Sequence, residues 1–323
     1  DEYYSLVHSK SNLAEMQALG ANSQLHVVKL PGYGKGHWAI ACALDKSIEV
    51  QLTQRSDRTV TIDSQLAQYC ASLDKLTELA DLSFVLKAIE LHLPELSQGF
   101  DLAIKAQFSH TLGLGSSAAV TVAVIQALCQ YTKTALSKPL HLKKALAVVH
   151  AIQGRGSGTD LAASIYGGVI AYRVNPSEVI PLSGLPKLGL YYVGYKTKTA
   201  DVLRHVAELE KHCSTLYVSI YQMMNDITVA AISAVKKQDW VHLGVLMNMY
   251  QGQMDSLGVN DAALSDIVYK LRDPDISKGR VLGAKISGSG LGDCVISLGD
   301  QLTLENYQSI NINTSANGVL IHD

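Results

Sequence analysis

The chain has 323 residues, of which 47% are hydrophobic and 17% charged, so it can bury one large or two moderate cores, and disorder is excluded as its main state. Its 27 basic and 29 acidic residues give a formal charge of −2, which offers no overall attraction to nucleic acid or to a membrane surface. No apolar stretch reaches the length of a membrane span, and no signal peptide is visible. We therefore expect a soluble, cytoplasmic protein without a nucleic-acid or membrane partner.

The cysteines and histidines predict neither a disulfide framework nor a metal site. The five cysteines are widely spaced, without a CxxC pair, and the eleven histidines are scattered. Because most of the cysteines lie in apolar runs, we expect reduced core residues.

The first third of the chain is predicted to form a sheet, because short runs of Val, Ile and Leu or alternating apolar residues recur along it. Helical periodicity follows over residues 82–93 and ends at Pro94. The expected strands are 24–30, 37–44, 47–53, 58–62 and 99–108.

A glycine-rich loop opens a helix at residues 112–119 (LGLGSSAA), before the small apolar residues 120–131. Glycines let backbone N–H groups surround an anion, and the start of the helix points further N–H groups at the same place. Ser116 and Ser117 could cap the helix, donate to a phosphoryl oxygen or ligate Mg²⁺. A tight turn with an N-cap is the structural alternative to a phosphate site.

Two more glycine-rich loops favour the phosphate interpretation, because glycine costs backbone entropy on folding. Residues 154–160 (GRGSGTD) follow a helix expected over 140–152, and residues 288–293 (GSGLGD) separate two strands. Neither a P-loop nor a Rossmann motif is completed. Arg155 is predicted either to hold a substrate carboxylate or phosphate, or to be a solvated loop charge.

Asp160 also has two interpretations. As an N-cap it would accept hydrogen bonds from the first amides of the helix over 161–166. As a general base it would accept the proton of a substrate hydroxyl that attacks a phosphoryl group. The three loops around it favour catalysis.

A cluster of prolines and a glycine over residues 176–186 predicts a domain boundary, so we expect an N-terminal domain over 1–185 and a C-terminal domain over 186–323. The second domain is predicted to contain long amphipathic helices, which leave a homodimer open. Its expected helices are 200–212, 214–236, 240–256 and 261–272, and its expected strands are 188–194, 283–287 and 294–298. We therefore expect a fold of two α+β lobes.

Three segments resemble the GHMP kinases, the family of galacto-, homoserine, mevalonate and phosphomevalonate kinases. Residues 112–119 resemble its second motif, the ATP-phosphate loop, residues 285–294 (KISGSGLGDC) the third motif, and residues 29–32 (KLPG) the start of the first. The resemblance implies an N-terminal lobe like ribosomal protein S5 domain 2, a ferredoxin-like C-terminal lobe, and ATP with Mg²⁺ in the cleft between them.

The resemblance also implies roles for individual residues. Asp160 matches the catalytic aspartate, and Ser117 matches the serine that helps to hold Mg²⁺. Arg155, Ser157 and Lys196 are the candidates for binding a small-molecule substrate. The implied ATP-binding residues are Gly113, Leu114, Gly115, Ser116, Ser117, Ala118, Gly288, Ser289 and Gly290.

Two departures from the family pattern are visible. After Gly32 the family continues with a lysine and roughly a dozen further residues, whereas here Tyr33 follows directly. We hypothesise that the natural protein carries this segment; if it is truly deleted, a non-catalytic relative becomes the competing interpretation. Ahead of Asp160, mevalonate kinases have a glutamate that ligates Mg²⁺, and residues 148–150 (VVH) supply no carboxylate.

The substrate is predicted from two conflicting resemblances. Residues 244–264 resemble mevalonate kinases, whereas residues 150–168 and the pair Asp293-Cys294 resemble phosphomevalonate kinases. A phosphorylated substrate would require several basic side chains, and this region offers mainly Arg155 and Lys196. We therefore predict an ATP-dependent kinase of the isoprenoid precursor pathway that acts on mevalonate, with phosphomevalonate as the alternative and a sugar kinase, a non-catalytic relative or a decarboxylase ranked below.

Overall fold

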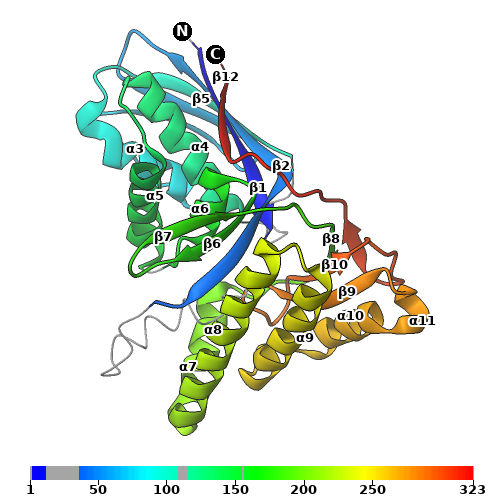
Figure 1. The fold of residues 1–323 in the computed structure, drawn as a ribbon. Coiled ribbons are helices and arrows are strands. Elements are labelled where there is room, and N and C mark those ends of the chain that lie inside the picture. The colour runs from blue at the N-terminus through cyan, green and yellow to red at the C-terminus, as the bar shows by residue number, and fades with distance from the viewer. Residues whose placement is uncertain (1, 12–35, 108–114, 155, 323) are drawn as a thin grey trace.

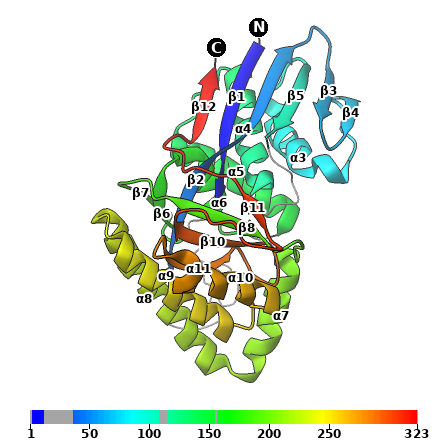
Figure 2. The same ribbon diagram turned by 90° about the vertical axis from the view of Figure 1, so that its right-hand side faces the viewer.

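The computed structural model describes residues 2–11, 36–107, 115–154 and 156–322, which form two lobes (Figure 1). The lobe that carries both chain ends contains a large sheet with helices on one face, and the other lobe packs long helices on a smaller sheet (Figure 2). The two-lobed α+β architecture predicted from the sequence is confirmed.

The larger sheet has the strand order β12-β1-β2-β5-β3-β4, and β6 pairs with β2 and β7. All its pairs are antiparallel except β3 with β5. Helices α3 to α6 pack on one face of it (Figure 1). The strands are β1 (Glu2–Ser11), β2 (Trp38–Gln54), β3 (Thr59–Ser64), β4 (Gln68–Ser72), β5 (Phe100–Ala106), β6 (Val169–Arg173), β7 (Glu178–Leu182) and β12 (Val319–His322); the helices are α3 (Ser83–His92), α4 (Ser116–Tyr131), α5 (Lys138–Gln153) and α6 (Thr159–Tyr166).

Strand β2 is one long strand where the sequence predicted two, with a break between residues 44 and 47. Its first part pairs with β6 and its second part with β5, so two partners lie in succession along the same edge. The expected break contains Asp45, whose carboxylate accepts hydrogen bonds from Asn313 N at 2.9 Å and Asn313 Nδ2 at 2.8 Å. Because this distant residue satisfies the charge, the strand continues through it.

The smaller sheet has the order β11-β8-β10-β9, and all its pairs are antiparallel. The four long helices predicted from periodicity are confirmed. The strands are β8 (Leu188–Tyr192), β9 (Val281–Ser287), β10 (Cys294–Gly299) and β11 (Gln308–Ile310); the helices are α7 (Thr199–His212), α8 (Ser214–Lys236), α9 (Trp240–Ser256), α10 (Ala262–Arg272) and α11 (Pro274–Ser277).

The core consists of two hydrophobic clusters, of which one joins the two lobes. One fills the space between the larger sheet and α3 to α6. The other joins the opposite side of β2 and β6, through residues such as Ile40 and Ala171, to the helices and sheet of the second lobe. At this junction Trp38 N donates to Asn225 Oδ1 at 3.2 Å. The predicted boundary between residues 185 and 186 falls between β7 and β8, where the chain changes from one sheet to the other.

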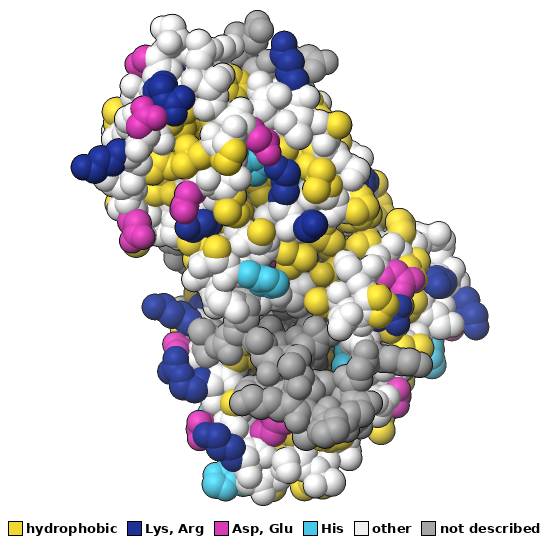
Figure 3. All heavy atoms as spheres, turned by 90° about the vertical axis from the view of Figure 1, so that its left-hand side faces the viewer, with side chains coloured by type: hydrophobic (Ala, Val, Ile, Leu, Met, Phe, Trp, Pro, Cys, Tyr) yellow, Lys and Arg dark blue, Asp and Glu magenta, His cyan; other side chains and the backbone are white. Residues whose placement is uncertain are grey.

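Lys and Arg side chains alternate with Asp and Glu over the face in Figure 3, in keeping with the balanced composition. Within the described ranges, no helix combines the length and the apolar character that crossing a membrane requires.

Candidate active site

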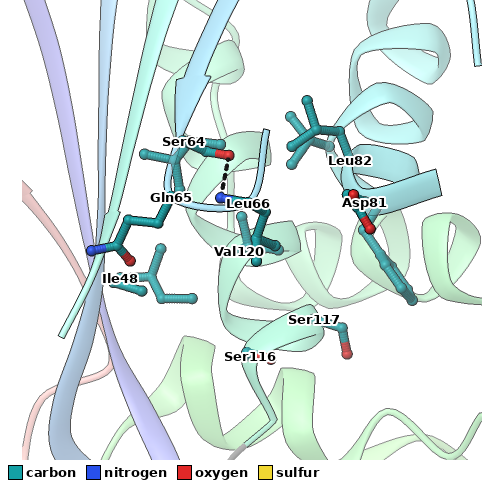
Figure 4. Close-up of a pocket in the computed structure, with 13 residues that line it drawn as sticks. Ile48, Ser64, Gln65, Leu66, Asp81, Leu82, Ser116, Ser117 and Val120 are labelled. Atoms are coloured by element: carbon teal, nitrogen blue, oxygen red, sulfur yellow. Dashed lines mark hydrogen bonds between the residues drawn. The ribbon is translucent and has the colours of Figure 1, made fainter. Parts of the chain in front are cut away.

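A pocket of about 340 Å³ lies in the N-terminal lobe beside the start of α4 (Figure 4). It is enclosed by the β3–β4 turn, the 3₁₀ turn η1 (Ala80–Leu82), α3 and α4, and its walls are mostly apolar. In the turn, Leu66 N donates to Ser64 Oγ at 3.2 Å. The lining residues are Ile48, Ser64, Gln65, Leu66, Asp81, Leu82, Phe84, Val85, Ile104, Ala106, Ser116, Ser117 and Val120.

The start of α4 leaves polar groups at this pocket. The N-cap is Gly115, with a left-handed φ of 71° and no side-chain capping bond. Ser116 and Ser117 are the first two residues of the helix, so their N–H groups have no acceptor inside the helix. Both side chains line the pocket and are half-buried. The alternative in which one of these serines is the N-cap of α4 is therefore wrong, and both residues line the pocket.

The start of α6 has the same design. Gly158, with φ 75°, is the N-cap and makes no side-chain capping bond, so Asp160 is the second residue of the helix. The alternative in which Asp160 is the N-cap is therefore wrong. Its half-buried carboxylate lies in the first turn, where the helix dipole favours a negative charge. Ser157 is fixed just ahead of it, because Tyr172 Oη donates to Ser157 O at 2.8 Å and the Ser157 and Thr159 hydroxyls lie 3.0 Å apart.

The turn between β9 and β10 has φ values in the left-handed range at most positions: Gly288 81°, Gly290 85°, Leu291 53°, Gly292 109° and Asp293 74°. Successive residues of this kind turn backbone N–H groups toward one side and form concave anion sites. Leu291 N donates to Val259 O at 2.7 Å, which anchors the turn on the loop after α9. A Cβ on Gly290 would lie 2.3 Å from that same oxygen, so only glycine fits there.

Lys196 contacts this turn. Its Nζ lies 3.5 Å from Asp293 Oδ2, and the Asp293 side chain is only 14% exposed, against 36% for Lys196. Burial raises the pKa of Asp293, and the charge of Lys196 opposes that shift. The sequence indicated Asp293 as the end of a glycine loop and as part of the Asp293-Cys294 pair, without a role of its own. Its pairing with Lys196 could not be predicted, because the two residues lie far apart in the chain.

The candidate residues fall into three groups. Ser116 and Ser117 lie at the pocket, Ser157 and Asp160 at the start of α6, and Lys196 at the turn with Gly288, Ser289 and Gly290. Helix α4 packs against α6, which connects the first two groups. Gly113, Leu114, Arg155 and residues 29–32 lie outside the described residues. Sequence reasoning missed the apolar pocket walls, such as Phe84 and Leu66, which carry no motif.

No group of three or more His, Cys, Asp or Glu side chains that could hold a metal ion is present in the described part of the chain. All five cysteines are free, and three of them are buried.

Comparisons with known proteins bear on this arrangement. Residues 83–168 match the GHMP kinases N terminal domain, and residues 231–309 match the GHMP kinases C terminal domain. The mevalonate kinase of Pyrococcus furiosus is 31% identical over 300 residues, which is 87% of each chain. The mevalonate kinase of Aeropyrum pernix is 30% identical over 273 residues, which is 82% of each. A solved structure, the Lin0012 protein from Listeria innocua, has a TM-score of 0.84 and 20% identity over 100% of both chains, and shares the fold.

Proposed function

The chain belongs to the GHMP kinase family, which makes it an ATP-dependent phosphotransferase, and we propose that it transfers the γ-phosphoryl group of ATP to a hydroxyl of mevalonate. The observation that carries the proposal is the apolar pocket beside Ser116 and Ser117, the first two residues of α4. Relatives at about 30% identity that are named mevalonate kinases support the choice of acceptor.

The pocket supports binding of the adenine base. Leu66, Leu82, Phe84 and Val120 offer an apolar cavity into which a flat aromatic base can pack, and aromatic stacking adds to that burial. The triphosphate would then extend to the N–H groups and hydroxyls of Ser116 and Ser117, where the dipole of α4 favours negative charge. The N–H groups of Gly288, Ser289 and Gly290 are proposed to close the site from the other lobe.

Asp160 is the proposed catalytic residue. It lies in the first turn of α6, where its carboxylate is proposed to accept the proton of the substrate hydroxyl as the oxygen attacks the γ-phosphorus. The phosphoanhydride bond between that phosphorus and the β-γ bridging oxygen breaks as the new phosphate ester forms, and ADP leaves with the electron pair of the broken bond. Ser157, Arg155 and Lys196 are the proposed substrate-binding residues.

The residues present fit a Mg²⁺ ion bound chiefly by the nucleotide. Mg²⁺ takes one or two protein oxygens together with substrate phosphates and water, so a site without a cluster of carboxylates suits it. Ser117 Oγ is the proposed protein ligand, since Ser117 lines the pocket at the start of α4 and is not the N-cap of that helix. When bound, the ion would neutralise charge on the phosphates.

Two further proposals concern the state of the protein. Five free cysteines are typical of the reducing cytoplasm, where we place it. A homodimer is also proposed, and the exposed apolar side chains of Val241, Val245 and Met249 on α9 offer a surface for it.

A coupled assay of ADP release tests the function. The purified protein is given MgATP with mevalonate, phosphomevalonate or galactose, one acceptor at a time. The proposal expects ADP release with mevalonate in large excess over the other two. Release with phosphomevalonate alone would move the substrate to the alternative acceptor, and no release with any of them would refute the kinase proposal.

A further inference from the structure

The segment after β8 and the turn before β10 are joined at several points. Val193 N donates to Asp293 O at 3.0 Å, and Asp293 N donates to Tyr195 O at 2.7 Å. Thr197 Oγ1 donates to Leu291 O, and the Lys196 ammonium faces the Asp293 carboxylate. Asp293 is thus the centre of the connection, because its backbone and its side chain both contact the segment that carries Lys196.

The ion pair with Asp293 uses at most one of the hydrogen-bond donors of the Lys196 ammonium. A hydrogen-bonded ammonium and carboxylate normally lie at about 2.7–2.9 Å, whereas here the atoms are 3.5 Å apart. An ammonium has three N–H donors, and the described residues give Lys196 no partner besides Asp293. The buried Asp293 carboxylate therefore contacts the Lys196 ammonium on one side and leaves N–H donors for a ligand.

Lys196 lies just ahead of helix α7. Helix α7 begins at Thr199, and its N-cap is Lys198, which makes no capping bond. The start of a helix carries partial positive charge, so two lysines placed just ahead of it repel that charge and each other. Asp201, in the first turn of α7, supplies one negative charge at this end, and an anionic ligand bound by Lys196 would supply another.

Backbone strain at the turn points the same way. Asp293 has a φ of 74° and Leu291 one of 53°, although neither is glycine. Non-glycine residues in this conformation are uncommon and cluster where function requires a fixed geometry. Stability alone does not explain why the turn holds the Lys196–Asp293 pair in this conformation, since burying a carboxylate beside one ammonium seldom gains stability.

We propose that Asp293 is a positioning residue, which holds the Lys196 ammonium beside the Gly288–Gly292 turn so that it binds the carboxylate of the acceptor substrate. The inference rests on the proposed function, because it assigns the acid group of the acceptor to Lys196 and the phosphates to the glycine loops. It adds a specificity determinant: an acceptor without the negative charge loses the contact with Lys196.

The test uses Asp293→Asn and Lys196→Gln, singly and together. Asparagine keeps the shape and tolerates the left-handed backbone, so Asp293→Asn removes the charge without forcing the turn to change. The matched control is Asp300→Asn. Asp300 pairs with Lys187 at 3.2 Å across the opposite end of the same two strands, and both partners are largely exposed.

Calorimetry measures the Kd of mevalonate and of its uncharged lactone, and kinetics measures KM and kcat. We expect each single substitution to raise the Kd and KM for mevalonate about tenfold, with the KM for ATP and the lactone affinity within twofold of wild type. The Kd and KM of the double variant for mevalonate should not exceed those of the more impaired single variant, because the two side chains act as one unit. Asp300→Asn should change nothing.

Several results would overturn the inference. These are an unchanged mevalonate affinity in both single variants, multiplied effects in the double variant, or a fall in ATP affinity of the same size. Wild-type protein that fails to bind mevalonate would also overturn it. Wild-type protein that binds mevalonate and prefers it to the lactone, but releases no ADP, would refute the kinase function and leave the inference standing.

Discussion

Replacing Gly290 with alanine should destabilise the protein by about 3 kcal/mol, and the amount can be worked from two contributions. The φ of 85° costs an L-residue about 1 kcal/mol. The new Cβ would lie 2.3 Å from Val259 O, a buried backbone atom that cannot rotate away, and the hydrogen bond from Leu291 N to the same oxygen would be displaced. Overpacking and the lost bond add about 2 kcal/mol.

Gly279→Ala is the matched control. Gly279 has a similar φ of 73°, but a Cβ there meets no atom within 4 Å, so only the backbone cost of about 1 kcal/mol applies. Urea unfolding followed by circular dichroism measures both variants. If the two lose the same stability, the close approach of the turn to Val259 is not what requires glycine. ADP release should fall in Gly290→Ala and stay at the wild-type rate in Gly279→Ala.

Three other predictions follow from the site and the core. Asp160→Asn should lower kcat for ADP release by about 10²–10⁴-fold while the unfolding midpoint stays near wild type, since asparagine keeps the shape of the side chain at the start of α6; an unchanged kcat would remove its catalytic role. Val120→Phe should fill the pocket and raise the KM for ATP at least about tenfold without affecting the KM for mevalonate, whereas Val241→Phe on the exposed face of α9 should alter neither. Burial lowers the pKa of His141 to about 4, below its unfolded value of 6.5. The free energy of unfolding should therefore be highest above pH 6.5 and fall by up to about 3 kcal/mol as the pH is lowered toward 4. Urea unfolding across this range should show the loss, and His141→Gln should make stability less dependent on pH.

Periodicity predicted the elements whose pattern is local. In the four long helices of the second lobe apolar residues recur at helical spacing, and each helix lies within one or two residues of its expected bounds. Glycine spacing likewise predicted the loops ahead of α4 and α6 and the turn between β9 and β10. The missed strands include short ones such as β7, β11 and β12, whose strand character depends on a distant partner, and also the long β1, which lies inside the larger sheet between β12 and β2.

The parts of the site that sequence reasoning could not predict depend on contacts between distant segments. Ser116 was assigned to phosphate from its loop, but the pocket beside it is made of ordinary apolar residues such as Phe84. The N-cap alternative for Asp160 failed because Gly158, in a left-handed conformation, takes that position. Asp293 became a candidate only when the antiparallel pairing of β8 with β10 brought it to Lys196.

The most direct test of the central claim follows the phosphoryl group itself. The protein is incubated with mevalonate and ATP labelled at the γ-phosphorus, and the products are separated and identified by mass spectrometry. The account predicts one labelled phosphoryl group on mevalonate for each ADP formed, and almost none with Asp160→Asn. Label that appears only as inorganic phosphate, or labelled mevalonate formed equally well by Asp160→Asn, would contradict it.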